Sequence, residues 1–468
     1  MTPITCFEGV SVALFGLGGS GLATARALRA GGARVHVWDD NANARDRAEA
    51  AGLDIANLAA ADWGQFDSLV LAPGVPLTHP APHWTVSHAR AAGVEIIGDI
   101  ELFCRERAAI APDAPFIGIT GTNGKSTTTA LIAHILFEAG CDVQLGGNIG
   151  TPILALEPPA HDRFHVIELS SFQIDLAPSL KPTVGILLNL SPDHIDRHGT
   201  MDGYAAVKER MIAAADTAIV GVDDGHSWAI GDRRQKAHTR EEGGLTIPVS
   251  VTRSLPFGVY ADGSKIFSTV AAGSPRELCD VAGVNSLRGQ HNAQNAAIAS
   301  ACADLWQFRD GVIADAVRTF PGLPHRLEEA GRSGHVVFIN DSKATNADAA
   351  ARALASFDEI YWIAGGRSKE GGITSLRPLM DRVRKAFLIG EAAEEFAATL
   401  AGVTDNRISG TLERAVAEAF EAALQSTAQE AAVLLSPACA SYDQFTDYEA
   451  RGDKFRELVR ALPGTVAL

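Results

Sequence analysis

The chain of 468 residues is longer than one ordinary domain, so two or three domains of roughly 100–200 residues each are expected. Hydrophobic residues make up 46% and charged residues 21%, the balance of a folded, water-soluble protein. The formal net charge of −16 argues against a nucleic-acid partner, which would require a clustered basic surface, but leaves small anionic substrates open.

The cysteines and the apolar segments indicate the compartment. The six cysteines are scattered without a Cys-x-x-Cys pair, which favours reduced intracellular thiols over a disulfide or zinc framework. The start of the chain lacks the basic stretch and cleavage site of a signal peptide. No apolar run reaches the roughly 20 residues that a membrane span requires. We therefore expect a cytoplasmic protein without membrane insertion. A monomer is a separate expectation that these features do not address.

Strand-like and helix-like segments alternate along almost the whole chain, which predicts α/β domains with mostly parallel sheets. The predicted strands, in chain order, are Val10–Phe15, Val35–Trp38, Ser68–Leu71, Phe116–Ile119, His165–Glu168, Gly185–Leu188, Val336–Ile339, Glu359–Ile363, Ala386–Ile389 and Ala432–Leu435. The longest helical pattern lies around His291–Trp306. Proline-bearing segments at 110–115 and 321–324 cannot continue a helix, and they predict three domains at 1–110, 111–321 and 322–468.

A first glycine-rich loop, Gly16-Leu-Gly18-Gly-Ser-Gly21, follows a predicted strand and opens a helix. Asp39 lies 18 residues past Gly21, at the end of the next strand, which is the context of a dinucleotide-binding loop. The glycines let the backbone approach a pyrophosphate, and the helix N-terminus supplies N–H donors. NAD and UDP both contain a pyrophosphate, so the motif does not name its ligand, and a purely structural turn also stays open.

A second loop, Gly121-Thr-Asn-Gly124-Lys125-Ser126-Thr127, also joins a predicted strand to a helix. Its backbone amides would surround phosphates, Lys125 would neutralise their oxygens, and Ser126 could bind Mg²⁺. It departs from the G-x-x-x-x-G-K-[ST] pattern, because Ile119 stands where the first glycine belongs. A nucleoside triphosphate site is favoured over a glycine turn with a solvent-exposed lysine.

Polar residues follow further strands of the middle segment. Glu168 and His194 come at the ends of two predicted strands, where they could converge on a divalent cation. Alternatively Glu168 caps the next segment, and His194 with His198 forms a zinc pair or faces solvent. Lys208 lies on a predicted helix, where a lone lysine is usually a solvated charge.

Asn292 and Asn295, three residues apart, share one face of the long predicted helix and could instead cap its start. Lys369 and Ser441 lie in loops after strands of the last segment, where a lysine and a hydroxyl suit a carboxylate ligand, although ordinary polar loops would look the same. Cys439 has no histidine partner nearby in sequence, and we interpret it as a small packing residue.

The string Thr-Gly-Thr-Asn-Gly-Lys-Ser-Thr at 120–127 resembles the ATP loop of the Mur ligases and their folylpolyglutamate synthetase relatives, and matching motifs recur in order in all three predicted domains. The resemblance implies a Rossmann-like UDP-binding domain, a central P-loop ATPase-like domain and a C-terminal Rossmann-like domain that binds an amino acid. It also implies ATP and Mg²⁺ as cofactors, with two metal sites.

The resemblance carries roles over to individual residues. It implies catalytic roles for Lys125, Glu168, His194 and Lys208, and it implies that Lys208 is carbamoylated by CO₂ so that, with Ser126, Glu168 and His194, it can bind metal. It implies ATP contacts for Gly121, Thr122, Asn123, Gly124, Lys125, Ser126, Thr127, Asn292, Asn295, Arg326 and Asp341. It implies substrate contacts for Gly18, Gly19, Ser20, Asp39, Asp40, Asn41, Pro73, Gly74, Asn148, Lys343, Thr345, Lys369, Ser441 and Tyr448.

The string Asn340-Asp-Ser-Lys-Ala-Thr-Asn346 resembles the family members that add D-glutamate. It implies that the substrates are UDP-N-acetylmuramoyl-L-alanine, D-glutamate and ATP, joined through an acyl phosphate. Tyr448 stands where phenylalanine is common and Tyr442 where an aliphatic residue is expected, so the detailed pocket geometry stays open. The alternatives are a Mur ligase for another amino acid, an NAD-dependent oxidoreductase, and a non-catalytic UDP-sugar sensor.

Overall fold

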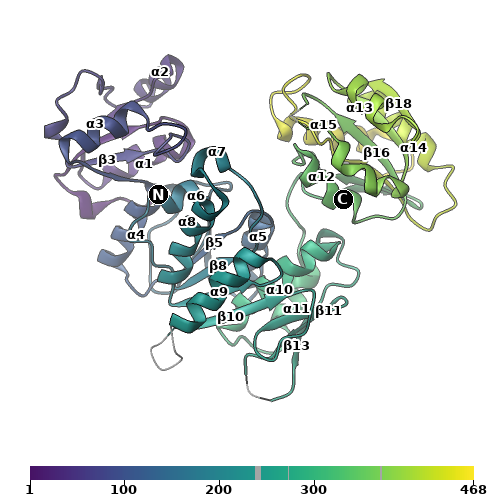
Figure 1. Ribbon diagram of the computed structural model, residues 1–468, viewed down its shortest axis with the longest axis horizontal. Helices are drawn as coiled ribbons and strands as arrows, with labels where there is room; N and C mark the ends of the chain where they lie inside the picture. Colours follow the sequence, from purple (N-terminus) through teal and green to yellow (C-terminus); the bar gives the residue numbers. More distant parts are fainter. Residues whose placement is uncertain (238–243, 272, 369–370, 468) are drawn as a thin grey trace. The chain divides into compact units, whose positions relative to one another are not determined.

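The computed structural model describes residues 1–237, 244–271, 273–368 and 371–467 (Figure 1). The chain forms two compact units. The first unit comprises Met1–Ala282 and Ala293–Thr319, and the second comprises Gly283–Asn292 and Phe320–Leu468.

The N-terminal part of the first unit is a four-stranded parallel sheet in the order β2-β1-β3-β4. Its strands are β1 (Ser11–Phe15), β2 (Arg34–Trp38), β3 (Ser68–Leu71) and β4 (Glu95–Ile97). All residues of β1 and β3 are buried, as expected for central strands covered on both faces. The helices of this part are α1 (Gly19–Ala30), α2 (Ala42–Ala50), α3 (Trp84–Ala92) and α4 (Asp99–Ile110).

The rest of the first unit is built on a nine-stranded sheet in the order β13-β12-β11-β10-β9-β8-β5-β7-β6. Its strands are β5 (Phe116–Thr120), β6 (Asp142–Gly147), β7 (Arg163–Glu168), β8 (Val184–Leu187), β9 (Thr217–Gly221), β10 (Leu245–Ser250), β11 (Val259–Asp262), β12 (Lys265–Ser268) and β13 (Arg276–Asp280). The strands from β6 to β11 pair in parallel, whereas β11, β12 and β13 pair antiparallel. Parallel strands bring their carboxyl ends to one edge, so the loops after β5, β6, β7 and β8 lie together.

Helices cover this sheet (Figure 1). They are α5 (Lys125–Glu138), α6 (Ser171–Asp175), α7 (Ile195–His198), α8 (Met201–Ala214), α9 (Gly225–Ala237), α10 (Gln290–Asp304) and α11 (Val312–Thr319), with α10 beginning in the segment assigned to the second unit. Helix α5 buries Leu131, Ile132, Ile135 and Leu136, which explains why an apolar sequence forms this helix directly after the glycine loop.

The second unit contains a seven-stranded sheet in the order β18-β17-β16-β19-β15-β14-β20. Its strands are β14 (Glu328–Ser333), β15 (Val336–Asn340), β16 (Ile360–Gly365), β17 (Val383–Ile389), β18 (Asn406–Gly410), β19 (Ala431–Leu435) and β20 (Val466–Ala467). The strands from β15 to β18 pair in parallel, and β14 pairs antiparallel with β15 and β20. Its helices are α12 (Ala347–Leu354), α13 (Ala393–Leu400), α14 (Leu412–Ala423) and α15 (Tyr448–Ala461).

The predicted α/β class with mostly parallel sheets is confirmed, and each predicted strand is present with its ends shifted by a few residues at most. Helix α4 ends at Ile110 and β5 begins at Phe116, on either side of the first proline-bearing segment. The predicted domain limits themselves stay predictions.

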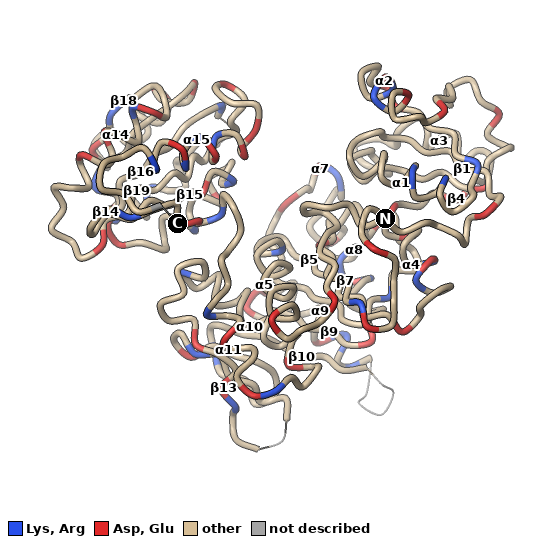
Figure 2. The backbone as a smooth tube through the Cα atoms, turned by 180° about the vertical axis from the view of Figure 1, so that it is seen from behind, with Lys and Arg blue, Asp and Glu red and all other residues tan. Residues whose placement is uncertain are grey.

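Charge and hydropathy along the described residues can also be compared with the sequence. Basic and acidic residues are mixed along the backbone of each unit (Figure 2), in keeping with 40 Lys and Arg against 56 Asp and Glu. Among the residues that the structure describes, no helix is long and apolar enough to cross a membrane.

Candidate active site

The loop 121–127 has the compact form that the sequence predicts. Gly121 and Gly124 have φ values of 150° and 84°, a region that favours glycine, and Gly124 is the N-cap of α5. A Cβ atom at Gly124 would lie 2.3 Å from Asn295 Oδ1, so a side chain there would collide with α10. Asn295 is buried and also accepts a hydrogen bond from Thr128 Oγ1 at 3.2 Å. Asn295 therefore braces the loop and the first turn of α5.

The loop is also fixed to the segment after β8. The Thr122 backbone N–H donates to Asn189 O at 2.8 Å, and the Asn123 backbone N–H donates to Asn189 Oδ1 at 3.0 Å. Lys125 Nζ lies over its own loop, where it donates to Gly121 O at 3.0 Å and Thr122 O at 2.8 Å. The cation and the N-terminus of α5 are thus held at one place, an arrangement suited to an anion such as a phosphate.

Glu168 ends β7, in register with Ile119 of β5 and Gly147 of β6. Its side chain is only 2% exposed, and its Oε1 accepts a hydrogen bond from Asn148 Nδ2 at 2.8 Å. The other oxygen, Oε2, is buried without a hydrogen-bond partner. An unsatisfied buried carboxylate oxygen is costly, and a divalent cation would satisfy it. This orphaned oxygen fits the magnesium role that the resemblance implies.

Lys208 is not a solvated surface charge, and that interpretation of the sequence is wrong. The residue is 1% exposed, and its Nζ donates to Thr120 Oγ1 at 2.8 Å and to Gly121 O at 3.1 Å. Burial, with the nearby positive charge of Lys125, holds the pKa of the Lys208 amine well below its usual range. The structure therefore places a buried amine, with a lowered pKa, against Thr120 and Gly121 at the start of the loop 121–127.

His194 is the N-cap of α7 and has a left-handed backbone conformation, with φ of 52°. Its ring is about half exposed, with Nε2 3.5 Å from Asp193 Oδ2, and it meets the edge of the Phe172 ring at 5.0 Å. His198 Nε2 instead lies 2.8 Å from Ser171 Oγ. Within the described ranges no group of three or more His, Cys, Asp or Glu side chains could hold a metal ion, and the zinc-pair alternative stays untested. His194 stays a predicted magnesium ligand.

The first glycine loop is shaped by the string that ends β2. Asp39 accepts hydrogen bonds from the backbone N–H of Leu17 at 2.7 Å and of Asn41 at 2.8 Å. Asn41 Oδ1 caps the start of α2, and Asp40 Oδ2 accepts from Trp84 Nε1 at 3.2 Å. These three side chains hold the loop and its neighbours, and their predicted substrate contacts stay predictions.

The predicted amino-acid site lies in the second unit, where polar residues follow β15 and β19. Asp341, which the resemblance assigns to ATP, also follows β15; it accepts a hydrogen bond from Ser436 Oγ at 2.8 Å, and burial raises its pKa to about 7. Lys343 Nζ lies 5.0 Å from the centre of the Tyr448 ring, and Ser441 is buried. Lys369 lies outside the described residues.

The remaining predicted positions can be located. Gly18 is the N-cap of α1, and Gly19 and Ser20 form its first turn. Pro73 and Gly74 follow β3, Ser126 and Thr127 lie in the first turn of α5, Asn292 lies in the first turn of α10, and Arg326 and Thr345 lie in loops on either side of β14 and β15.

Family models match three successive segments of the chain. They are the Mur ligase MurD-like N-terminal domain at residues 10–98, the Mur ligase middle domain at 119–303 and the Mur ligase glutamate ligase domain at 325–439. The UDP-N-acetylmuramoylalanine–D-glutamate ligase of Nitrobacter winogradskyi is 60% identical over 467 residues, which cover 99% of each chain. The chain belongs to the Mur ligase family.

Further Mur ligases support this assignment. The enzyme of the same name from Agrobacterium fabrum is 58% identical and covers 100% of this chain and 98% of its own. The solved structure of the UDP-N-acetylmuramate-alanine ligase MurC of Thermotoga maritima superposes with a TM-score of 0.58 at 16% identity, covering 96% and 99% of the two chains. The MurF ligase of Thermotoga maritima in complex with ADP gives a TM-score of 0.54 at 14% identity, with 98% and 97% covered. These structures share the three-domain Mur ligase fold.

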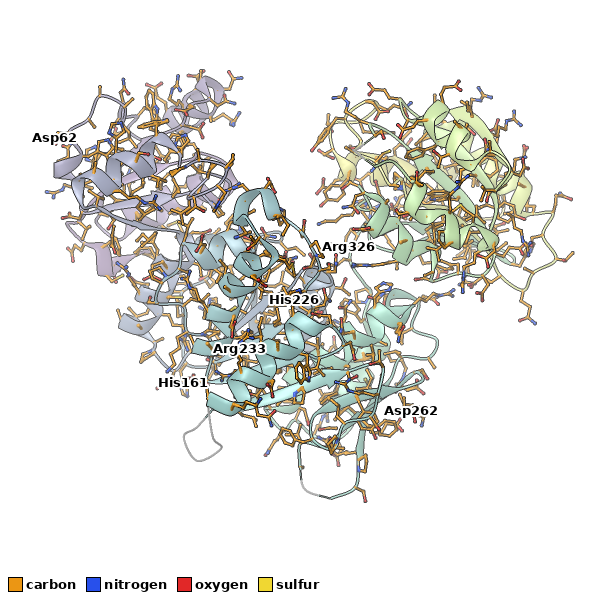
Figure 3. All side chains as sticks on the ribbon, viewed as in Figure 1. Asp62, His161, His226, Arg233, Asp262 and Arg326 are labelled. Carbon is orange, nitrogen blue, oxygen red and sulfur yellow. The ribbon has the colours of Figure 1, made fainter. Side chains whose placement is uncertain are left out.

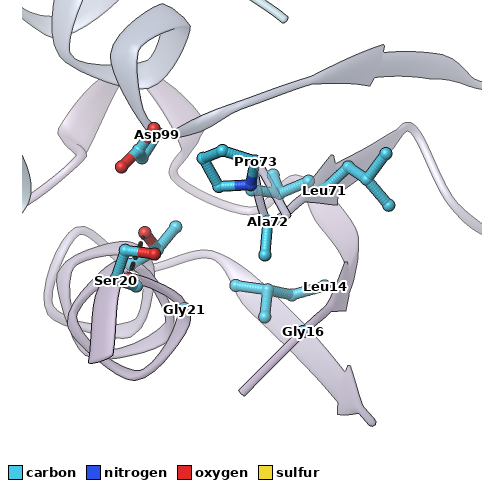
Figure 4. Close-up of a pocket in the computed structure, with 10 residues that line it drawn as sticks. Leu14, Gly16, Ser20, Gly21, Leu71, Ala72, Pro73 and Asp99 are labelled. Atoms are coloured by element: carbon cyan, nitrogen blue, oxygen red, sulfur yellow. Dashed lines mark hydrogen bonds between the residues drawn. The ribbon is translucent and has the colours of Figure 1, made fainter. Parts of the chain in front are cut away.

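The structure of this Mur ligase also reveals a buried acid that the sequence analysis missed. Asp99 opens α4 and faces a cavity of about 10 Å³ next to Ser20, Gly21 and Pro73 (Figure 4). It has only 5% of its surface exposed, burial raises its pKa to about 6, and Gln173 of α6 donates a hydrogen bond to it. The sequence feature that could have identified Asp99 is its place directly after β4, at the carboxyl edge of a parallel sheet.

We expect Asp99 to make the protein less stable as the pH rises from about 4 to about 6. The folded protein holds the Asp99 proton across this range and the unfolded chain releases it, so the free energy of unfolding falls. Urea unfolding across this range should show that Asp99→Asn loses on the order of 3 kcal/mol of that pH dependence. The exposed control Asp54→Asn should retain it, and an unchanged pH dependence in Asp99→Asn would contradict the assignment.

Arg451 is a second residue that the sequence analysis missed. It lies in α15, is 1% exposed, and its guanidinium donates to Ser342 Oγ at 3.0 Å, Ser342 O at 2.8 Å and Cys439 O at 3.2 Å. It thereby joins the loops after β15 and β19, which carry most of the predicted amino-acid contacts of this Mur ligase. Cys439 is fully buried, which fits a packing role. A single arginine in an amphipathic helix forms no sequence pattern that would predict contacts with the loops after β15 and β19.

Proposed function

We propose that this Mur ligase adds D-glutamate to UDP-N-acetylmuramoyl-L-alanine in peptidoglycan precursor synthesis, with conversion of ATP to ADP and phosphate. The observation that carries this proposal is the similarity to enzymes named UDP-N-acetylmuramoylalanine–D-glutamate ligase, which are 57–60% identical over nearly their whole length. The ATP loop with Lys125, and the buried Glu168 beside it, supply the chemistry that such a ligase needs.

The reaction requires activation, because a carboxylate does not react with an amine at neutral pH. The terminal carboxylate of the UDP-linked substrate attacks the γ-phosphorus of ATP, forming an acyl phosphate and releasing ADP. The D-glutamate amine then attacks the acyl carbon, an amide bond forms, and phosphate leaves with the former C–O bonding pair. The ammonium loses its proton to give the neutral amide, and the residue that accepts this proton is not assigned.

In the first step Lys125 and the N-terminus of α5 stabilise negative charge on the transferred phosphoryl group, an electrostatic and positioning role. Ser126, Glu168 and His194 would hold Mg²⁺, which supplies charge neutralisation at the phosphate oxygens when bound. Asn148 orients Glu168 through its 2.8 Å hydrogen bond to Oε1, and Oε2 is the oxygen that would bind the cation.

We further propose that Lys208 is carbamoylated and holds a second Mg²⁺. Its neutral amine attacks CO₂, an N–C bond forms and one proton is released, which converts the side chain to an anion. The burial of the amine and its lowered pKa favour the neutral form that this reaction requires.

The amino-acid specificity is proposed from Lys343, Thr345, Lys369, Ser441 and Tyr448, with Arg451 holding their loops together. The alternative of a different amino acid is less well supported, because the full-length relatives carry the D-glutamate name. The oxidoreductase alternative leaves the 121–127 loop without a purpose. A monomeric state and a cytoplasmic location stay predictions.

Phosphate release from ATP and Mg²⁺ with UDP-N-acetylmuramoyl-L-alanine tests the proposal, with D-glutamate, L-glutamate, L-alanine and meso-diaminopimelate offered in parallel. We expect release that depends on both the nucleotide substrate and D-glutamate. Release with another amino acid would overturn the assigned specificity and keep the ligase class. ATP binding without turnover in any mixture would favour the non-catalytic sensor.

A further inference from the structure

Helix α7 positions His194 but has little means of holding itself in place. It is a four-residue turn, Ile195–His198, with His194 as its N-cap, and none of its residues is buried. A single turn has no stability of its own, because nucleating a helix costs more than the first hydrogen bond returns. The direction of the His194 side chain is therefore set by side-chain contacts between α7 and its neighbours.

Several of these contacts converge on Phe172 of α6. The His198 ring stacks on the Phe172 ring with 5.4 Å between centroids and 7° between planes. The Arg197 guanidinium lies 4.5 Å from the centre of the same ring, and the His194 ring meets its edge. His198 adds a directional contact, because its Nε2 lies 2.8 Å from Ser171 Oγ.

Helix α6, against which α7 packs, is itself held firmly in place. It begins three residues after Glu168, and Ser170 and Gln173 close a capping box at its start. Ser171 and Gln173 are also buried, at 2% and 4% exposure. The hydrogen bond between Ser171 and His198 therefore ties the helix that follows His194 to the strand that ends in Glu168.

We propose that His198 is a positioning residue for the divalent cation, holding His194 at the place relative to Glu168 that a shared ion requires. This inference rests on the proposed function, in which Glu168 and His194 bind Mg²⁺. His198 acts through its hydrogen bond to Ser171 and its stack on Phe172, and the Tyr204 ring of α8 lies 5.4 Å from it in a tilted arrangement.

Two substitutions remove the hydrogen bond from opposite ends. His198→Phe retains an aromatic ring for the stack, and Ser171→Ala leaves the histidine intact. Mn²⁺ serves as the probe, titrated by electron paramagnetic resonance against the full chain with saturating ADP. We expect each variant to raise the Mn²⁺ dissociation constant roughly fivefold, the value of one hydrogen bond. The double variant should bind no more weakly than either single variant, because both changes remove the same contact.

Controls separate positioning from general damage. His161→Phe changes a histidine that is 82% exposed in the loop before β7 (Figure 3) and should leave Mn²⁺ binding unchanged. His198→Gln keeps a polar group that can hydrogen-bond to Ser171 Oγ and should recover part of the affinity. Unfolding temperatures of the His198 and His161 variants should stay close to the wild type, because α7 buries none of its residues and His161 is exposed. Ser171→Ala removes a buried hydroxyl from α6 and should lower the unfolding temperature slightly.

The outcomes also distinguish this inference from the proposed function. Unchanged Mn²⁺ affinity in His198→Phe, additive losses in the double variant, or a wild type that binds no Mn²⁺ would each overturn the positioning role. Turnover of the wild type with D-glutamate is measured separately. A wild type that is inactive with D-glutamate, yet whose Mn²⁺ affinity depends on His198, would overturn only the substrate assignment.

Discussion

Replacing Lys125 with methionine should lower the rate of ADP formation about 10³-fold, the size of effect expected when a cation that stabilises a transferred phosphoryl group is lost. Methionine keeps much of the length of the side chain and removes its charge. The loop is also fixed to Asn189 through the backbone N–H groups of Thr122 and Asn123, which the substitution leaves in place, so the loop should keep its shape. Steady-state ADP formation with all three substrates measures the effect.

The matched control for this substitution is Lys236→Met, which removes a lysine with 75% of its side chain exposed on α9. It should leave the rate unchanged. Binding of UDP-N-acetylmuramoyl-L-alanine to the Lys125 variant, measured by calorimetry, should also stay near the wild-type value, because the first glycine loop, and not Lys125, is the proposed contact of the UDP group. A rate within tenfold of the wild type in Lys125→Met would show that this lysine does not stabilise the transferred group.

Replacing Lys208 with alanine should also reduce turnover about 10³-fold, because the change removes the anion that would hold the second Mg²⁺. Lys208→Glu places a carboxylate on a shorter side chain and should recover a measurable part of the activity. Lys208→Met tests packing alone, since it fills the buried space without a charge, and it should be as inactive as the alanine variant.

Carbamoylation can be detected without measuring activity. Wild-type protein equilibrated with ¹³C-labelled CO₂ should give a carbamate carbon resonance that is absent from Lys208→Met. A Lys208→Glu variant no more active than Lys208→Ala, together with a wild type that lacks the resonance, would refute the modified lysine. Full activity in Lys208→Ala would remove Lys208 from the mechanism altogether.

The sequence located the parts of the candidate site that depend on short-range pattern. A buried strand followed by glycines and a helix predicted the loop at 121–127, and the same logic placed Glu168 at a strand end. The parallel sheet then brings these ends to one edge, which is why Glu168 lies in register with Ile119. The antiparallel pairing of β12 and β13 was not predicted, because short half-buried strands carry a weak pattern.

The residues that the sequence analysis missed or misjudged depend on distant partners. Asp99 is held by Gln173, and Arg451 by Ser342, 109 residues away. Asp39 also holds the backbone of Leu17 and Asn41 through its two carboxylate oxygens, and its substrate contact stays a prediction. For Asp99 and Arg451 the sequence showed the residue itself but not the distant residue that it contacts.

The sequence by itself determined the α/β class, the order of the motifs and the family, because periodicity, turn chemistry and motif spacing act over a few neighbouring residues. Only the tertiary structure decided which charges are buried and what they touch. Lys208 shows the difference: its helical context indicated a solvated lysine, and it became a buried amine only because Thr120, 88 residues away, lies against it. Desolvation and hydrogen bonding act through space, so the chemistry of such a residue is fixed when the distant segments pack together.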